Sequence, residues 1–193
     1  MIKIELRSRV GNLCDYMFNF CWHNRQLDPD ATIPYQNGTG YTYRNLTDAL
    51  KTGTEVHIKG DVGGRLAQGM GVDIWHLGGT GGIGTETASL IFVDGDVGGE
   101  AGFGMVAGAV YVSGVVEEPL GNIIEVRSDV AGYRKFVSVT DLLCNHQTEV
   151  PVSNSLDPEK LRLVLHDGIL RGTLCARCDC PVEVLVDGDA HNG

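Results

Sequence analysis

The sequence predicts an all-β fold, namely a short right-handed β-helix (solenoid) with a small mixed N-terminal cap and a cysteine-bearing C-terminal cap. Three observations support this fold class. The 27 glycines of the 193-residue chain are about twice the number expected from the ~7% average, and they concentrate in its middle third. Short strand-like segments alternate with these glycines, and the segment 60–70 recurs as the segment 95–105. We expect a cap over residues 1–52, the β-helix over residues 53–136 and a C-terminal segment over residues 137–193.

The repeat is clearest where residues 60–70 are placed over residues 95–105. Both copies begin Gly-Asp-Val-Gly-Gly, at Gly60 and Gly95, and both end in Gly-Met, so that seven of eleven positions agree. Gly78 lies about midway between Gly60 and Gly95, and Gly114 continues the series at a similar spacing. The spacing predicts a period of about half the distance from Gly60 to Gly95, with each of these glycines marking one coil.

The segments between the glycines have the composition of strands. Residues 56–59, 72–77, 90–94 and 109–113 are apolar or alternate between apolar and polar, and they are rich in Val and Ile. Strands this short at this spacing leave no room for long helices. We therefore expect stacked coils whose inward Val, Ile and Leu form one continuous core, with the flanking segments covering the open ends.

The flanking segments are expected to be mixed. Residues 2–6 are strand-like, and residues 43–50 predict a short helix for which Thr42 is the candidate N-cap. Near the other end, strand-like residues 161–166 and 182–186 flank a cysteine-rich turn, an arrangement typical of a small zinc-ribbon-like hairpin.

The charge of the chain excludes two classes of partner. A formal net charge of -10 without a cluster of Lys or Arg repels phosphate backbones and acidic membrane surfaces, so we expect no nucleic-acid and no membrane partner. No stretch approaches ~20 apolar residues, and the first residues lack the apolar core of a signal peptide. The expected location is cytoplasmic.

The familiar catalytic motifs are missing or misplaced. Residues 79–84 match G-x-G-x-x-G, but only residues 85–89 separate them from the next strand, which is too short for the crossover helix of a nucleotide-binding unit. The sequence contains neither a P-loop nor a Gly-x-Ser-x-Gly elbow. Glu117 and Glu118 are neighbours on a turn and are interpreted as solvated. No catalytic residue is predicted.

The candidate metal site is the sequence Cys175-x-x-Cys178-x-Cys180. Three thiols so close in sequence can converge on one tetrahedral ion, which would be zinc or an iron-sulfur cluster. The alternative is that these cysteines are unmetallated or form a redox-active pair. A fourth ligand is required, and the first candidate is Cys144. The other candidates are His146, Cys14, Cys21 and His23.

The glycine repeat resembles a known family. The order of strand, Gly-Asp turn and Gly-Met step, at Gly60 to Met70 and again at Gly95 to Met105, is similar to the GXGXG repeat domain. That domain ends the large subunit of glutamate synthase and occurs in the C subunit of formylmethanofuran dehydrogenase. The resemblance covers residues 53–136 and weakens at residues 115–119 and 128–132. It implies a right-handed β-helix that holds catalytic domains or subunits together.

Two functions follow as expectations. The first is a non-catalytic scaffold subunit of a multi-subunit redox enzyme resembling glutamate synthase or formylmethanofuran dehydrogenase, with other protein subunits as partners. The alternative is a metal-binding (Fe-S or Zn) electron-transfer or enzymatic protein that uses Cys175, Cys178 and Cys180.

Overall fold

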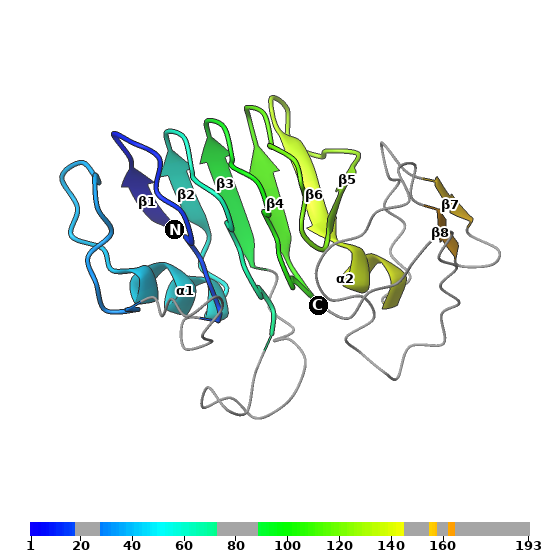
Figure 1. The fold of residues 1–193 in the computed structure, drawn as a ribbon, viewed down its shortest axis with the longest axis horizontal. Coiled ribbons are helices and arrows are strands. Elements are labelled where there is room, and N and C mark those ends of the chain that lie inside the picture. Colours follow the sequence, from blue (N-terminus) through cyan, green and yellow to red (C-terminus); the bar gives the residue numbers. More distant parts are fainter. Residues whose placement is uncertain (18–27, 73–88, 145–154, 158–161, 165–193) are drawn as a thin grey trace.

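The computed structural model describes residues 1–17, 28–72, 89–144, 155–157 and 162–164. Its main feature is a six-stranded mixed sheet with the strand order β1-β2-β3-β4-β6-β5 (Figure 1). The strands are β1 (Ile2–Glu5), β2 (Val56–Lys59), β3 (Leu90–Asp94), β4 (Ala109–Val112), β5 (Ile123–Val126) and β6 (Arg134–Ser138). The helices are α1 (Tyr43–Lys51) and α2 (Val139–Cys144), and a separate antiparallel pair consists of β7 (Ser155–Asp157) and β8 (Arg162–Val164).

The first four strands of the sheet are parallel and stack in register. Val56 of β2 lies between Ile2 of β1 and Ile91 of β3, and Ile91 in turn pairs with Val110 of β4. A second line of parallel bridges joins the turns that follow β2, β3 and β4, through Val62, Val97 and Val116. Each strand therefore continues into a turn that lies against the equivalent turn of its neighbour.

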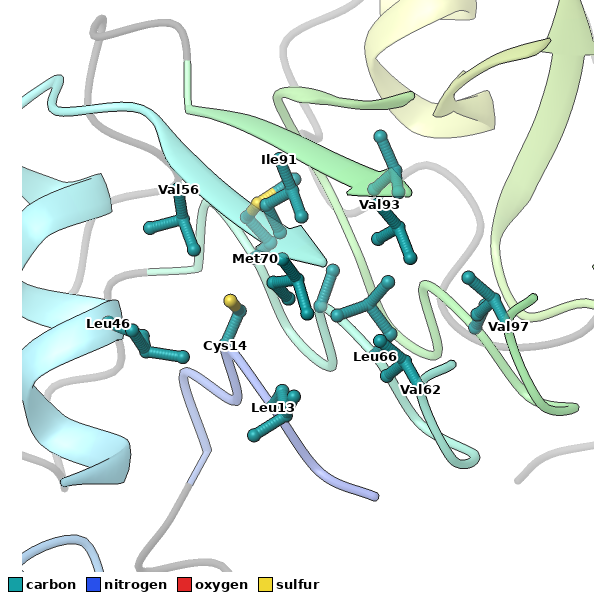
Figure 2. Packing of buried hydrophobic residues seen from close by; sticks show 14 of the residues in the cluster. Leu13, Cys14, Leu46, Val56, Val62, Leu66, Met70, Ile91, Val93 and Val97 are labelled. Atoms are coloured by element: carbon teal, nitrogen blue, oxygen red, sulfur yellow. The ribbon is translucent and has the colours of Figure 1, made fainter. Parts of the chain in front are cut away.

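The core lies between the sheet and these turns. Alternate strand residues such as Val56 and Val93 face it, and the turns contribute Leu13, Leu66 and Met70, all almost completely buried (Figure 2). β-branched residues suit this position because they pack well on a pleated, buried surface. The repeating apolar residues thus form one continuous cluster, as expected from the sequence.

A column of glycines holds the turns together at the ends of the strands. The Gly60 N–H donates to the Asp94 carbonyl oxygen (2.9 Å), and the Gly114 N–H donates to the Gly95 carbonyl oxygen (3.1 Å). A Cβ atom on Gly95 would lie only 2.5 Å from the carbonyl oxygen of Gly60. The turns therefore touch backbone to backbone, and a side chain at this position would push them apart.

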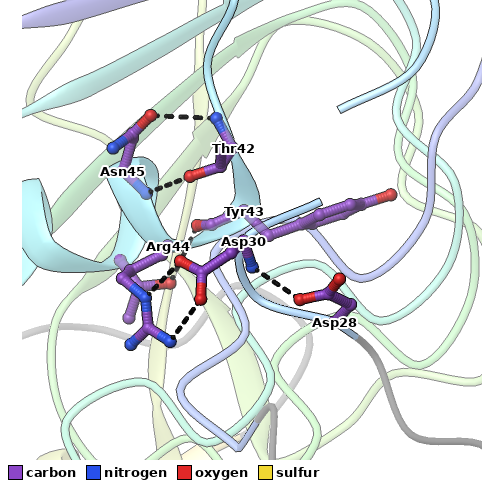
Figure 3. Close-up of polar contacts among 7 residues, drawn as sticks. Asp28, Asp30, Thr42, Tyr43, Arg44 and Asn45 are labelled. Atoms are coloured by element: carbon purple, nitrogen blue, oxygen red, sulfur yellow. Dashed lines mark hydrogen bonds and ion pairs between the residues drawn. The ribbon is translucent and has the colours of Figure 1, made fainter. Parts of the chain in front are cut away.

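Helix α1 begins where the sequence predicts. The Asn45 N–H donates to the Thr42 hydroxyl oxygen (3.3 Å) and the Thr42 N–H donates to the Asn45 side-chain oxygen (2.9 Å), which is a reciprocal capping box (Figure 3). Arg44 forms an ion pair with Asp30 (2.7 Å), and the guanidinium lowers the pKa of that carboxyl. The helix expected over residues 43–50 is confirmed.

The expected fold class is wrong. The chain is not an all-β helix, because the six-stranded sheet is mixed and helix α1 lies between β1 and β2 in the chain. β6 pairs antiparallel with both β4 and β5. The physical reason is the length of the connections: only residues 127–133 join β5 to β6, and so short a link allows a hairpin but not a parallel crossover. The described architecture is of the mixed α/β type.

The expected repeat period also needs correction. β2 pairs directly with β3, with Val56 opposite Ile91, so the two strands are neighbours in the sheet and this step spans the full repeat instead of half of it. The strand expected over residues 72–77 falls almost entirely outside the described residues. Only the step from β3 to β4, with Leu90 opposite Ala109, has a spacing close to the expected one.

In the part of the chain that the structure describes, no helix combines the length and the apolar character that crossing a membrane would require.

The glycine column generates a stability prediction. We expect Gly95→Ala to destabilise the fold by about 2 kcal/mol, because the new Cβ would overlap the Gly60 carbonyl. The matched control is Gly40→Ala, where nothing lies within 4 Å of a new Cβ and the change in the free energy of unfolding should stay within about 1 kcal/mol. Urea denaturation of the two variants measures both values, and equal stabilities would contradict the proposed close contact.

Candidate functional site

The face of the sheet opposite the core, here called the outer face, carries a row of stacked rings. His57 of β2 stacks on Phe92 of β3 with the ring centroids 4.5 Å apart and an interplanar angle of 15°. Phe92 stacks on Tyr111 of β4 at 4.6 Å and 9°. These distances match the spacing of neighbouring strands, roughly 4.8 Å, because the three residues are directly opposite one another in the register. We call His57, Phe92 and Tyr111 the aromatic row.

The Tyr111 end of the row is held by polar contacts. The Tyr111 hydroxyl donates to the Asp129 carboxylate (2.8 Å), and the Lys135 ammonium lies 5.9 Å from the centre of the Tyr111 ring and 3.8 Å from Asp129. Burial, followed by the Asp129 hydrogen bond, raises the pKa of Tyr111, while the same hydrogen bond lowers the pKa of Asp129. Tyr111 is therefore a neutral, fixed hydrogen-bond donor.

The other rings of the outer face are also held by contacts with neighbouring residues. Tyr133 meets Phe92 edge to face at 5.7 Å and 85°, and its hydroxyl donates to the Asp94 carboxylate. That hydrogen bond raises the pKa of Tyr133. At the opposite end, His57 Nε2 lies 3.2 Å from a Glu55 oxygen. The rings thus form a rigid surface before anything binds to it.

Helix α2 covers only part of the outer face. Its residues Val139 and Leu142 belong to a second apolar cluster with Ala109, Ile124 and Val137 of β4, β5 and β6. Leu90 and Phe92 of β3 lie at the edge of this cluster and remain only partly buried. Among the described residues, α2 packs over β4, β6 and β5 of the outer face, while Leu90, Phe92 and His57 on β3 and β2 stay partly exposed.

A cluster of charges lies at the turns. Arg9 contacts three carboxylates: Glu117 at 2.6 Å, Asp96 at 3.8 Å and Asp61 at 4.0 Å. All four side chains are about half exposed. The guanidinium contacts carboxylates from three successive turns, so the cluster links these turns to one another.

Asp15 is a buried carboxyl beside the core. Its Oδ1 accepts the Met17 N–H (2.7 Å), which lowers its pKa, as does the charge of Arg65, but burial outweighs both and raises the pKa to about 6. The neighbouring turn contributes Gln68, whose carbonyl oxygen accepts the Tyr16 N–H. The side-chain oxygen of Gln68 is buried and has no hydrogen-bond partner among the described residues.

The predicted metal ligands are not brought together in the described part of the chain. Cys175, Cys178 and Cys180 lie outside the described residues, and Cys144 is the last residue of α2. His146, Cys21 and His23 also lie outside them. The described ranges contain no group of three or more His, Cys, Asp or Glu that could hold a metal ion. The metal site stays a prediction.

Cys14, a weaker candidate ligand, is a core residue. Its side chain is fully buried among Leu13, Leu46 and Met70 (Figure 2), and burial raises the pKa of the thiol. A neutral thiol inside an apolar cluster is not placed to bind a metal.

Two other sequence interpretations have separate outcomes. The glycine-rich residues 79–84 lie outside the described ranges. Glu117 and Glu118 are exposed turn residues, as expected: Glu117 pairs with Arg9, and Glu118 accepts the Leu120 N–H (3.0 Å).

The aromatic row was not predicted, although the sequence contains a signal for it. His57, Phe92 and Tyr111 each precede a glycine of the column, namely Gly60, Gly95 and Gly114, by the same number of positions. Once these glycines are known to stack, the residues at one fixed offset from them must stack as well. The sequence alone does not show which strands pair, so the shared spacing from the glycines does not by itself place the three rings side by side.

Comparisons with known proteins add one relative. The chain is 46% identical over 191 residues to a protein of Methanothermobacter thermautotrophicus that is described as uncharacterized. The alignment covers 98% of this chain but 60% of the relative, so the chain spans about three fifths of the relative's length. No family model matches the sequence. No solved structure matches it either.

The buried carboxyl generates a prediction about pH. The folded pKa of Asp15, about 6, lies above its ordinary value of 3.8, so the fold favours the protonated form. The protonated Asp15 should therefore stabilise the fold fully below about pH 4. This stabilisation, about 3 kcal/mol in the free energy of unfolding, should be lost as the pH rises from about 4 to about 6 and stay absent at higher pH. Asp15→Asn retains an oxygen for the Met17 N–H and cannot ionise.

We therefore expect Asp15→Asn to be more stable than the native chain at pH 7.5 and close to it at pH 4. Urea denaturation across this pH range measures the difference, with Asp48→Asn, a change at an exposed residue of α1, as the control. If the free energies of unfolding of the native chain and of Asp15→Asn change with pH in parallel, the carboxyl of Asp15 does not have a raised pKa in the folded chain.

The cysteine cluster generates a prediction about metal. If Cys175, Cys178 and Cys180 bind a structural zinc or an iron-sulfur cluster, protein purified without air should contain bound metal, and replacing these three cysteines by Ser should remove it. Visible absorption distinguishes iron from zinc. Cys14→Ala is the control that should retain the metal, because Cys14 is a core residue. Native protein free of zinc and iron would exclude the site.

Proposed function

We propose that this chain is a non-catalytic scaffold subunit of a cytoplasmic, multi-subunit redox enzyme of the glutamate synthase or formylmethanofuran dehydrogenase type. The likeness of its glycine repeat to the GXGXG domain supports the class of complex. The described residues support the scaffold role by a separate argument, which concerns the use of the charged side chains.

The observation that carries the proposal is that charged side chains on successive turns hold those turns to one another. The Asp61 carboxylate accepts the N–H of Asp96 (3.0 Å), and the Asp96 carboxylate accepts the N–H of Val115 (2.8 Å). Arg65 and Glu100, which occupy equivalent positions in the two copies of the repeat, form an ion pair at 2.6 Å. Groups that a catalyst would direct at a substrate are here directed at the next turn.

Asp15 and Tyr16, whose pKa values burial raises, are also enclosed. Asp15 is 5% exposed, which leaves a substrate little access to its carboxyl. The hydroxyl groups of Tyr16 and Ser89 lie 3.1 Å apart and are buried, and Ser89 also donates to the Leu50 carbonyl oxygen. These polar groups satisfy one another inside the fold, as a structural role requires.

The length of the relative is also consistent with a scaffold role. Nearly all of this sequence is matched in a protein of which roughly two fifths lies outside the match. A scaffold is expected to occur beside further polypeptide, either in one chain or as subunits, because its role is to hold other parts in place.

Affinity purification of the full chain from its native cells tests this proposal. We expect the chain to elute with larger subunits that carry the redox centres, well above its own mass of 20.7 kDa, and the isolated chain to have no turnover. Size-exclusion chromatography followed by peptide identification provides the measurement. Recovery of the chain alone as a monomer would rule the scaffold role out.

A further inference from the structure

We infer that Asn37 is a site of spontaneous deamidation in the folded chain, and that the guanidinium of Arg7 promotes the reaction. The product is a mixture of aspartate and isoaspartate at position 37. Asn37 and Gly38 lie between β1 and α1, in the loop that runs along the outer edge of β1 (Figure 1). The inference concerns a chemical modification and does not depend on the scaffold function proposed above.

The reaction requires only the Asn37 side chain, the Gly38 backbone and water. The Gly38 nitrogen gives its proton to the solvent and attacks Cγ of Asn37, which closes a succinimide ring. The bond from Cγ to Nδ2 then breaks, and this nitrogen takes up a proton and leaves as ammonia. Water opens the ring at either of its carbonyl carbons, which gives aspartate or isoaspartate. No group is oxidised or reduced.

Gly38 leaves its nitrogen open to this reaction. Glycine has no Cβ to shield the nitrogen, and at Gly38 nothing lies within 4 Å of the place where a Cβ would be. Within the described residues the Gly38 N–H donates no hydrogen bond. Asn37 and Gly38 are both exposed, so water reaches the reacting atoms.

Arg7 is placed to stabilise the charge that develops during the attack. Its Nη2 donates a hydrogen bond to Oδ1 of Asn37 at 2.5 Å. Oδ1 becomes negatively charged when the Gly38 nitrogen adds to Cγ, and a donor that is already in position stabilises this charge without rearrangement. Nδ2 of Asn37, the leaving group, donates no hydrogen bond in the described part of the chain.

The edge of β1 holds Asn37 beside Arg7. The Arg7 N–H donates to the Tyr35 carbonyl oxygen (2.9 Å), and the Asn37 N–H donates to the Glu5 carbonyl oxygen (2.8 Å). The two side chains are 30 positions apart in the sequence. The dipeptide Asn-Gly therefore supplies the reacting atoms, whereas the guanidinium is supplied by the tertiary structure.

Deamidation would change the segment that covers the edge of β1. In the aspartate product, a carboxylate faces the Arg7 guanidinium, so an ion pair replaces the hydrogen bond to a neutral amide. In the isoaspartate product, the main chain runs through Cβ and Cγ and gains a carbon atom between positions 37 and 38. Because this segment protects a strand edge, the reaction alters that protection as the protein ages.

The test incubates the folded full chain at mildly alkaline pH and follows Asn37 by peptide mass spectrometry. Replacing NH2 by OH raises the peptide mass, and chromatography separates the aspartate and isoaspartate forms. The variants are Arg7→Met, which removes the guanidinium, and Gly38→Ala, which places a Cβ beside the attacking nitrogen. The matched control is Arg127→Met, at an exposed residue near the opposite end of the sheet. Circular dichroism confirms that each variant is folded.

The inference predicts that Asn37 is converted at the same rate in the native chain and in Arg127→Met. Arg7→Met should slow the conversion by about threefold or more, and Gly38→Ala by about tenfold or more. Asn45, which precedes a leucine, should stay intact as the internal reference. An Asn37 that stays intact in the folded chain, under conditions that convert it in the urea-unfolded chain, overturns the site.

The variants separate the two parts of the inference. If the native chain and Arg7→Met react at equal rates, Arg7 does not promote the reaction and that part is overturned. If the native chain and Gly38→Ala react at equal rates, the succinimide route is overturned.

Discussion

The close contact between glycine backbones of successive turns is the constraint on which the rest of the structure depends. At Gly60, Gly95 and Gly114 the turns approach to hydrogen-bonding distance with no room for a side chain between them. This contact sets the register of the strands that lead into the turns. Both the apolar core on one face and the aromatic row on the other are consequences of that register, because equivalent residues are then forced into line.

A stack of this kind needs its two ends closed, since an open strand edge pairs with other chains. At the β1 end, residues 35–37 lie along the edge, where the Asn37 N–H donates to the Glu5 carbonyl oxygen (2.8 Å). At the other end the antiparallel β5–β6 hairpin replaces the next parallel unit. The change of strand direction thus ends the repeat, and α2, which follows β6 directly, covers the adjoining part of the outer face.

The aromatic row and the buried carboxyl differ in how far the sequence could reveal them. The aromatic row follows a fixed offset from the glycines and becomes predictable once the pairings of β2 with β3 and of β3 with β4 are known. Asp15 has no such signal, because its raised pKa comes from burial by segments distant in sequence. The cysteines remain a pattern at the level of sequence, since Cys175, Cys178 and Cys180 lie outside the described residues.

The sequence by itself determined features that depend on neighbouring residues: the N-cap at Thr42, the strand segments of β1 to β4 and the glycine turns. Strands β5 and β6 were not predicted. Only the tertiary structure decided the fold class, the pairing of β2 with β3 and the existence of two different faces. These depend on which distant segments meet and in which direction. The hydrophobic effect that drives such contacts is non-directional, so a pattern of apolar residues specifies that strands are buried but not which strands they pair with.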